Sequence, residues 1–212
     1  LVVGNSSWDA GGGIGINNAS ARVTQCIITN NYMTGHNLNT RGGGGVWMSA
    51  GQIDNSLIAF NRTSHQTQTQ GGAVYMSGAN TRLINCTIAH NRIASGAAAN
   101  AGIHMVNGIV SNCIVWANST NFPATTTENL YRAAGTIAHS CIQPLPDGIG
   151  NIADDPLFKN SAGGNFNLAH GSPCVNAGDT SIWTADSLDL FGNPRILNKH
   201  VDIGAIENPL PG

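Results

Sequence analysis

Acidic residues are scarce in the first two thirds of this chain, which limits the acid–base chemistry available there. Between positions 10 and 145 the only acids are Asp54 and Glu128. Glycoside hydrolysis generally uses two carboxyl groups that flank the bond, and calcium-assisted lyases use several oxygen ligands beside a basic residue. The positions related to Asp54 by the repeat described below carry no acid, so no carboxylate pair is evident in this region.

Histidines are the remaining candidates for proton transfer in the same region. They include His65, His90, His104 and His139. A lone histidine among turns is more often a hydrogen-bonded surface residue than a catalytic group. The sequence therefore favours a non-catalytic body and leaves catalysis by histidine or arginine as an open alternative.

Most acidic residues collect after position 146, where two interpretations are open. They are Asp147, Asp154, Asp155, Asp179, Asp186, Asp189, Asp202 and Glu207. Oxygen ligands of this kind suit Ca²⁺, although their spacing matches no EF-hand or RTX calcium pattern. The alternative, which we favour, is that these residues cap turns and that Arg195 pairs with Asp189 or Asp202 to fix the fold of the segment.

The composition describes a weakly charged, turn-rich chain. Its 212 residues include 27 Gly and 26 Asn, and charged residues make up 9% of the chain, against roughly 25% in an average globular protein. The net charge of −2 excludes a nucleic-acid binder that works through a basic face. No run of apolar residues is long enough to predict membrane insertion. An all-β domain is the remaining class.

Two patterns repeat along the chain with one shared period of about thirty residues, the length of a solenoid repeat. The first apolar position of a glycine-flanked segment recurs at Ile14, Val46, Val74 and Ile103, at spacings of 32, 28 and 29. A small residue recurs at Cys26, Ser56, Cys86, Cys113 and Cys141, at spacings of 30, 30, 27 and 28. A unit of this size cannot bury its apolar side alone, so the repeats are expected to stack.

Short apolar strands between Gly- and Asn-rich turns predict a parallel β-helix of about five coils, with two or three strands per repeat. Stacking in register sends two columns inward, Ile14/Val46/Val74/Ile103 and Ile16/Met48/Met76/Met105. The column of Cys26, Ser56, Cys86, Cys113 and Cys141 lines a narrow inner edge, where we expect reduced, buried thiols. A second column, of Asn31, Asn61, Asn91 and Asn118, indicates a ladder of side-chain amides, the alternative being ordinary turn residues.

Two groups of motifs carry a family resemblance. The segments Gly71-Gly72-Ala73-Val74 and Asn85-Cys86-Thr87-Ile88 are typical of right-handed parallel β-helix proteins of the pectate-lyase-like superfamily, which the chain resembles from residue 11 to about 145. Later motifs, among them Asp154-Asp155-Pro156-Leu157-Phe158 and Val201-Asp202-Ile203-Gly204, resemble the C-terminal segment of bacterial secreted proteins of the choice-of-anchor Q type. These resemblances imply β-helix coils over 1–146, a capping segment over 147–212 packed on the helix, and a secreted or cell-surface bacterial location.

A column of aromatic residues is the most suggestive feature for binding. Trp47, Tyr75 and His104 fall between the two inward columns, so alternation predicts that they point outward on successive coils. Exposed aromatic faces bind sugar rings, which makes these three residues the candidate glycan-binding site. The alternatives are cross-strand stacking that stabilises the sheet, and coverage by a loop or by the C-terminal segment.

These observations predict a non-catalytic extracellular or cell-surface module for glycan binding, adhesion, or surface or fibre assembly. The expected partner is a polysaccharide or surface glycan. Open strand edges near Leu1-Val2-Val3 add neighbouring copies of the chain or flanking β-helix coils as alternative partners. The superfamily resemblance keeps a secreted polysaccharide lyase or glycoside hydrolase, acting on an acidic polysaccharide, as the alternative function. No catalytic residue is assigned, and the only cofactor considered is Ca²⁺ in the acidic segment.

Overall fold

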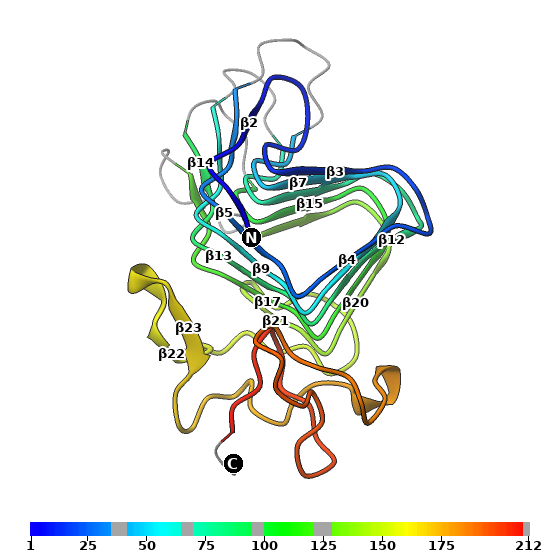
Figure 1. Cartoon of the computed structure of the whole chain (residues 1–212), viewed down its shortest axis with the longest axis vertical. Helices are drawn as coiled ribbons and strands as arrows, with labels where there is room; N and C mark the ends of the chain where they lie inside the picture. Colours follow the sequence, from blue (N-terminus) through cyan, green and yellow to red (C-terminus); the bar gives the residue numbers. More distant parts are fainter. Residues whose placement is uncertain (35–41, 65–69, 95–99, 121–128, 210–212) are drawn as a thin grey trace.

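The chain forms a parallel β-solenoid, which confirms the predicted fold class. The computed structural model describes residues 1–34, 42–64, 70–94, 100–120 and 129–209. Figure 1 looks along the coils and shows the turns stacked one behind another, with the C-terminal segment beside β17 and β21. Within the described residues no helix is long and apolar enough to cross a membrane.

Strands of successive turns pair in parallel to form four sheets, numbered here in the order in which each complete turn, beginning at β3, visits them. Sheet I contains β3 (Ile14–Ile16), β7 (Val46–Met48), β11 (Val74–Met76), β15 (Ile103–Met105) and β19 (Leu130–Arg132). Sheet II contains β4 (Arg22–Thr24), β8 (Gly51–Asp54), β12 (Thr81–Ile84), β16 (Ile109–Ser111) and β20 (Thr136–Ala138). Sheet III contains β1 (Val2–Val3), β5 (Ile27–Thr29), β9 (Leu57–Ala59), β13 (Thr87–Ala89), β17 (Ile114–Trp116) and β21 (Cys141–Ile142). Sheet IV contains β2 (Ser6–Ser7), β6 (Tyr32–Met33), β10 (Arg62–Thr63), β14 (Arg92–Ile93) and β18 (Ser119–Thr120).

Each complete turn therefore has four short strands instead of the two or three expected. The turns β3–β6, β7–β10, β11–β14 and β15–β18 are complete, and partial turns precede and follow them. The difference arises at the two corners that flank sheet III, where single residues adopt positive φ. These residues are Gln25, Asn55, Asn85, Asn112 and His139 before the sheet, and Asn30, Phe60, His90 and Ala117 after it. A single residue in the left-handed region turns the chain at each of these corners. A stretch that alternation alone would predict as one strand is therefore divided into a strand of sheet II, a strand of sheet III and a strand of sheet IV.

The inward columns form the apolar core, as predicted. Val46, Val74 and Ile103 are fully buried, as are Met48 and Met76. They pack with the inward residues of sheets II and III into one continuous cluster. Glycine is required where the chain enters sheet I, because a Cβ on Gly44 would lie 2.3 Å from the Gly72 carbonyl oxygen and 2.6 Å from that of Arg62.

A ladder of buried asparagines joins the coils at the corner between sheets III and IV, which confirms the predicted amide stack. Each side-chain oxygen accepts hydrogen bonds from the backbone and side-chain amides of the preceding coil. Asn91 Oδ1, for example, accepts from Asn61 N at 2.9 Å and from Asn61 Nδ2 at 3.0 Å, and Asn91 Nδ2 donates to the Ile58 oxygen at 2.9 Å. The ladder extends beyond the predicted residues to Asn5 and Asn129.

The cysteine column differs from the prediction in its last member. Ser140, not Cys141, occupies the inner edge, because the Cys113 backbone N–H donates to Ser140 Oγ at 3.1 Å. Cys141 lies opposite Ile114 on sheet III and packs outward, against Cys174. Ser140 lies 27 residues after Cys113, the same spacing that separates Cys113 from Cys86, so the prediction of Cys141 was one residue too far along the chain. All five cysteines are free thiols in the structure.

The C-terminal segment lies along the outer face of sheet III as well as over the last turn. It contains an antiparallel hairpin of β22 (Phe158–Asn160) and β23 (Asn165–Leu168), and the 3₁₀ helices Ser161–Gly163 and Thr180–Ile182. One apolar cluster joins Phe166, Leu190, Ala205 and Ile206 to Leu57, Ala59 and Ala89 of sheet III. A second cluster joins Leu168, Cys174 and Ile203 to Ile114 and Cys141. The segment thereby covers the apolar outer face of sheet III.

We predict that Asn91→Ala destabilises the protein by about 2–3 kcal/mol, because it leaves the buried Asn61 amide without its acceptor. Urea unfolding at neutral pH measures the loss. Asn17→Ala, at an exposed turn position, is the matched control and should change stability by less than about 0.5 kcal/mol. Equal free energies of unfolding for the two variants would mean that the asparagine ladder does not stabilise the fold.

Candidate functional site

The candidate glycan-binding residues form one column on the outside of sheet I. Tyr75 lies directly opposite Trp47 on one side and opposite His104 on the other. The column begins at Gly15, opposite Trp47, and continues to Tyr131, opposite His104. The structure thus brings together all three residues that the sequence singled out.

Ring stacking continues along this column. The Tyr75 and His104 rings lie 5.1 Å apart, centroid to centroid, with an angle of 11° between their planes. The His104 and Tyr131 rings lie 4.5 Å apart with an angle of 18°. Such offset parallel rings attract each other beyond the area that they bury.

Exposure along the column corrects the prediction in one respect. His104 was expected to be an exposed member, but it is only 6% exposed because Tyr75 and Tyr131 cover both faces of its ring. Tyr131, at 43%, presents the most accessible ring, while Trp47 and Tyr75 are half-buried. Sequence analysis missed Tyr131 because the glycine-flanked motif is absent there: Glu128 and Asn129 precede Leu130. The signal that could have found it is the apolar Leu130, which continues the inward column opposite Ile103.

The buried histidine is held neutral in the stack. Burial lowers the pKa of His104 to about 4, so the imidazole carries no charge at neutral pH. Its Nδ1 lies 3.4 Å from Nδ2 of Asn100, which is itself buried. The centre of the column is therefore uncharged, and the column can offer the exposed ring of Tyr131, the edges of its stacked rings and a tyrosine hydroxyl to a ligand.

Asp54 is unsuited to acid–base catalysis, because its carboxylate is already bonded on all sides. It is fully buried, and Arg22 Nε and Thr24 Oγ1 each donate to it at 2.6 Å. Gln52 Nε2 donates at 2.9 Å. Glu128, the other acid of this region, lies outside the described residues, as does His65.

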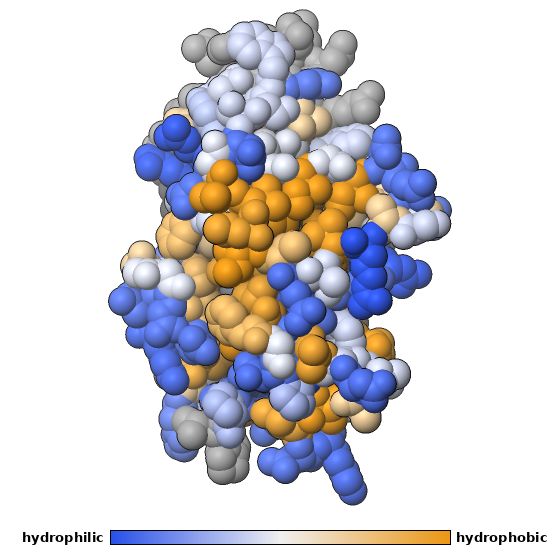
Figure 2. All heavy atoms as spheres, viewed as in Figure 1, coloured by the Kyte–Doolittle hydropathy of each residue, from blue (hydrophilic) through white to orange (hydrophobic). Residues whose placement is uncertain are grey.

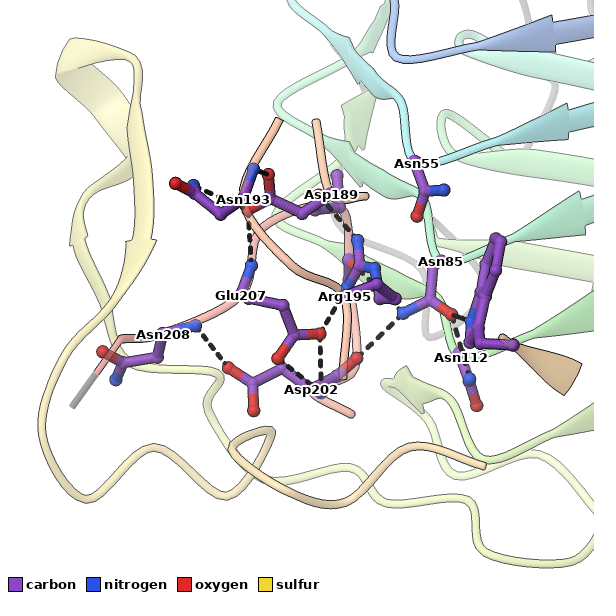
Figure 3. Close-up of polar contacts among 12 residues, drawn as sticks. Asn55, Asn85, Asn112, Asp189, Asn193, Arg195, Asp202, Glu207 and Asn208 are labelled. Carbon is purple, nitrogen blue, oxygen red and sulfur yellow. Dashed lines mark hydrogen bonds and ion pairs between the residues drawn. The ribbon is translucent and has the colours of Figure 1, made fainter. Parts of the chain in front are cut away.

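The acidic C-terminal segment gathers its buried charges around Arg195 (Figure 3). Arg195 Nη1 donates to Glu207 Oε1 at 2.7 Å, and the guanidinium also bonds the carbonyl oxygens of Gly204 and Ala205. The ion pair is therefore with Glu207, not with Asp189 or Asp202 as predicted. Those two carboxylates instead accept backbone N–H groups, as turn-capping residues do.

These bonds also bear on the suggested Ca²⁺ site. Asp189 Oδ2 accepts from the Glu207 backbone N–H, and Asp202 Oδ2 accepts from that of Asn208, so their oxygens face N–H donors. Burial raises the pKa of Glu207 to about 7 and raises that of Asp202. Within the described residues no group of three acidic, histidine or cysteine side chains is placed to hold a metal ion.

The same segment is anchored to the coils by the asparagines of the corner before sheet III. Asn85 Nδ2 donates to the carbonyl oxygens of Asp202 and Gly204, and Trp183 Nε1 donates to Asn85 Oδ1 at 2.7 Å (Figure 3). Asn112 bonds both the backbone N–H and the carbonyl oxygen of Asp179. These left-handed corner residues therefore hold the segment as well as turning the chain.

A second aromatic group is closed off by the hairpin. Phe60 and His90 stack at a centroid distance of 5.5 Å, and Phe166 of β23 packs against both rings. Burial lowers the pKa of His90 as well. This group serves packing, so the column on sheet I remains the candidate binding site.

Comparisons with family models, with curated proteins and with solved structures gave no significant match.

We predict that His104 makes the folded protein less stable in mild acid. Its folded pKa of about 4 lies below the unfolded value, which is about 6.5. The unfolded chain then binds more protons between these values, so stability falls as the pH decreases through this range. The measurement is the urea midpoint from pH 7 to pH 4. His104→Phe keeps a ring in the stack and leaves His90 in place, so its urea midpoint should decrease less than that of the wild type over this pH range. An equal decrease in both proteins would mean that His104 is not the group responsible.

We predict that Arg195→Met destabilises the protein by about 3–5 kcal/mol, because Glu207 keeps its buried position without its partner. The free energy of unfolding in urea tests this. Lys159→Met removes an exposed charge of the same sign from β22 and should have little effect. A stable Arg195→Met protein would mean that the cluster does not hold the C-terminal segment.

Proposed function

We propose that this chain is a non-catalytic carbohydrate-binding module that acts outside the cell. The observation that carries the proposal is the outward column of Trp47, Tyr75, His104 and Tyr131 on sheet I. The ligand is a polysaccharide or surface glycan that lies along the column, with Tyr131 as the most accessible ring.

Ring geometry supports this role. Sugar rings present C–H groups on their faces, and these pack against flat aromatic surfaces. The solenoid places one side chain of the column on each coil, so neighbouring members are about 4.8 Å apart along the axis. Tyr75, His104 and Tyr131 stack closely and are fixed before a ligand arrives, which reduces the entropy lost on binding.

Charge and bonding around the acids support binding over catalysis. Asp54 is buried and bonded to Arg22, Thr24 and Gln52, which leaves it without a free oxygen for proton transfer. The competing function is a secreted polysaccharide lyase or glycoside hydrolase acting on an acidic polysaccharide. It would require acid–base groups beside the column, and cleavage of a bound polysaccharide would favour it.

A role in adhesion or assembly is compatible with the proposed location of the protein, at the bacterial surface or secreted outside the cell. Figure 2, which has the same view as Figure 1, shows apolar residues gathered on the end of the solenoid that faces the reader. Exposed Leu1 and Val3 and half-buried Ile14 and Val23 belong to the first turns. A neighbouring copy or a flanking coil that pairs with these strand edges is the corresponding partner.

Affinity electrophoresis through gels that contain neutral polysaccharides tests the proposal. We expect wild-type protein to be retarded by at least one polysaccharide and Tyr131→Ala to lose most of that retardation, because the substitution removes the exposed ring of the column. Trp47→Ala should weaken it further.

Phe191→Ala is the matched control, because Phe191 is an aromatic residue of the C-terminal segment that is even more exposed than Tyr131, at 58% against 43%. It should migrate like the wild type. Equal losses for Phe191→Ala and Tyr131→Ala, or no retardation on any gel, would assign the column to packing.

A further inference from the structure

Two buried cysteines meet where the C-terminal segment crosses the last turn of the solenoid. Cys141 of β21 faces outward from sheet III, Cys174 lies in the C-terminal segment, and neither side chain is exposed. Both belong to one apolar cluster with Ile114, Leu168 and Ile203. The Cys174 thiol is hydrogen-bonded with the Cys141 thiol, and this bond together with burial raises the pKa of Cys174. The structure therefore brings together two free thiols that are 33 residues apart in the chain.

The backbone holds both cysteines in these positions. The Cys141 N–H donates to the Cys113 carbonyl oxygen at 2.9 Å, beside the parallel pairing of β17 with β21. The Cys174 carbonyl oxygen accepts from the Ile203 N–H at 2.9 Å, and the Cys174 N–H donates to Ser172 Oγ at 3.2 Å. A covalent bond between the two sulfurs would therefore join parts of the backbone that are already fixed.

The cysteines of the inner edge have a different role, in which sulfur takes the place of a serine hydroxyl. Cys113 Sγ accepts from the Cys86 N–H at 3.4 Å, as Ser140 Oγ accepts from the Cys113 N–H at 3.1 Å. Each group also donates to a carbonyl oxygen two residues earlier in the chain, Cys113 to Ser111 at 3.2 Å and Ser140 to Ala138 at 2.9 Å. Oxidation would remove the proton that Cys113 donates to this buried carbonyl group, so the inner edge requires reduced thiols.

Oxidation of Cys141 would disturb less of the structure. Its thiol donates to the Asp154 carbonyl oxygen at 3.2 Å. Asp154 is exposed, so water can replace this weak hydrogen bond when the proton is lost. Cys141 and Cys174 are therefore the two cysteines that can be joined without cost to the inner edge.

We propose that Cys141 and Cys174 form a disulfide bond that ties the C-terminal segment to the last turn of the solenoid. This inference rests on the proposed location outside the cell, where disulfides form and persist. The bond closes a loop that contains the hairpin of β22 and β23, and a closed loop of this length removes conformational freedom from the unfolded chain. The disulfide thereby adds a covalent link to the hydrogen bonds and apolar contacts that hold the segment on sheet III.

Thiol–disulfide exchange with a small disulfide or with a thiol oxidoreductase supplies the oxidation. The thiolate of one cysteine attacks the disulfide of the oxidant, which gives a mixed disulfide and releases the first reduced thiol. The thiolate of the other cysteine then attacks the protein sulfur of the mixed disulfide, forms the bond between Cys141 and Cys174 and expels the second reduced thiol. The two released thiols carry away the two protons and two electrons that the protein loses. Both sulfurs are buried in the closed structure, so the first attack precedes docking of the segment.

Refolding of the reduced full chain in a mixture of glutathione and glutathione disulfide tests the proposal. Free thiols are alkylated in denaturant, and trypsin then places each cysteine on a separate peptide, because a basic residue lies between every two neighbouring cysteines. We expect the peptide of residues 133–159, with Cys141, to be joined to that of residues 160–195, with Cys174, until a reductant separates them. Reduction of the folded protein should lower its melting temperature by roughly 5–10 °C. Recovery of both cysteines in alkylated form, or a pairing that includes Cys86 or Cys113, would overturn the proposal.

Cys86→Ser is the matched control, because serine already occupies the same column at Ser56 and Ser140. It should form the same joined peptides and show the same decrease in melting temperature on reduction. The variant Cys141→Ser/Cys174→Ser should melt at the temperature of the reduced wild type and should not respond to the reductant. A decrease in this variant equal to that of the wild type would overturn the proposal.

The polysaccharide gels keep this result separate from the proposal for sheet I. Tyr131→Ala should form the disulfide as the wild type does. Disulfide-bonded protein that no polysaccharide retards would contradict glycan binding alone, whereas retarded protein in which Cys141 and Cys174 stay reduced after refolding would overturn the disulfide alone.

Discussion

The register between coils depends on the buried asparagine ladder. Each amide has one oxygen and two N–H donors, and the neighbours that satisfy them lie on the coils before and after it. Asn91 bonds to Ile58 and Asn61 in the preceding coil and to Asn118 in the next. A slip of one residue would leave several buried amide groups without partners, at a cost of about 1–3 kcal/mol for each. The ladder therefore allows one alignment, and every other column inherits it.

The outer columns follow from this alignment. Once Asn31, Asn61 and Asn91 are stacked, the next residue of each coil must also stack, which brings Tyr32, Arg62 and Arg92 into one line. The same registration on sheet I aligns Trp47, Tyr75 and His104. A solenoid thus converts a sequence period into rows of identical spacing on its surface, and repeated ligands such as polysaccharides can match such rows. Sheet III is the exception, because its outward residues are apolar and the C-terminal segment covers them.

Much of this arrangement could be predicted from the period alone. Two columns of apolar residues and one of asparagines gave the fold, the core and the outward direction of Trp47 and Tyr75, because alternation and stacking are local consequences of strand geometry. Features that depend on contacts far apart in sequence could not be predicted. Arg195 had three acidic candidates nearby in the chain, and only the path of the segment decides for Glu207. Tyr131 was missed because Glu128 and Asn129 stand before Leu130, where the earlier repeats carry glycine or alanine. Cys141 was assigned to the inner edge because cysteine recurs there, whereas Ser140 keeps the 27-residue spacing from Cys113 and occupies the position.

The division of charge gives the C-terminal segment a second consequence beyond covering sheet III. Its buried acids lie around Arg195, its other acids are more exposed, and the coils carry the opposite charge. A negatively charged segment on one side of the solenoid and basic coils on the other produce an asymmetric field, which would orient a charged partner as it approaches.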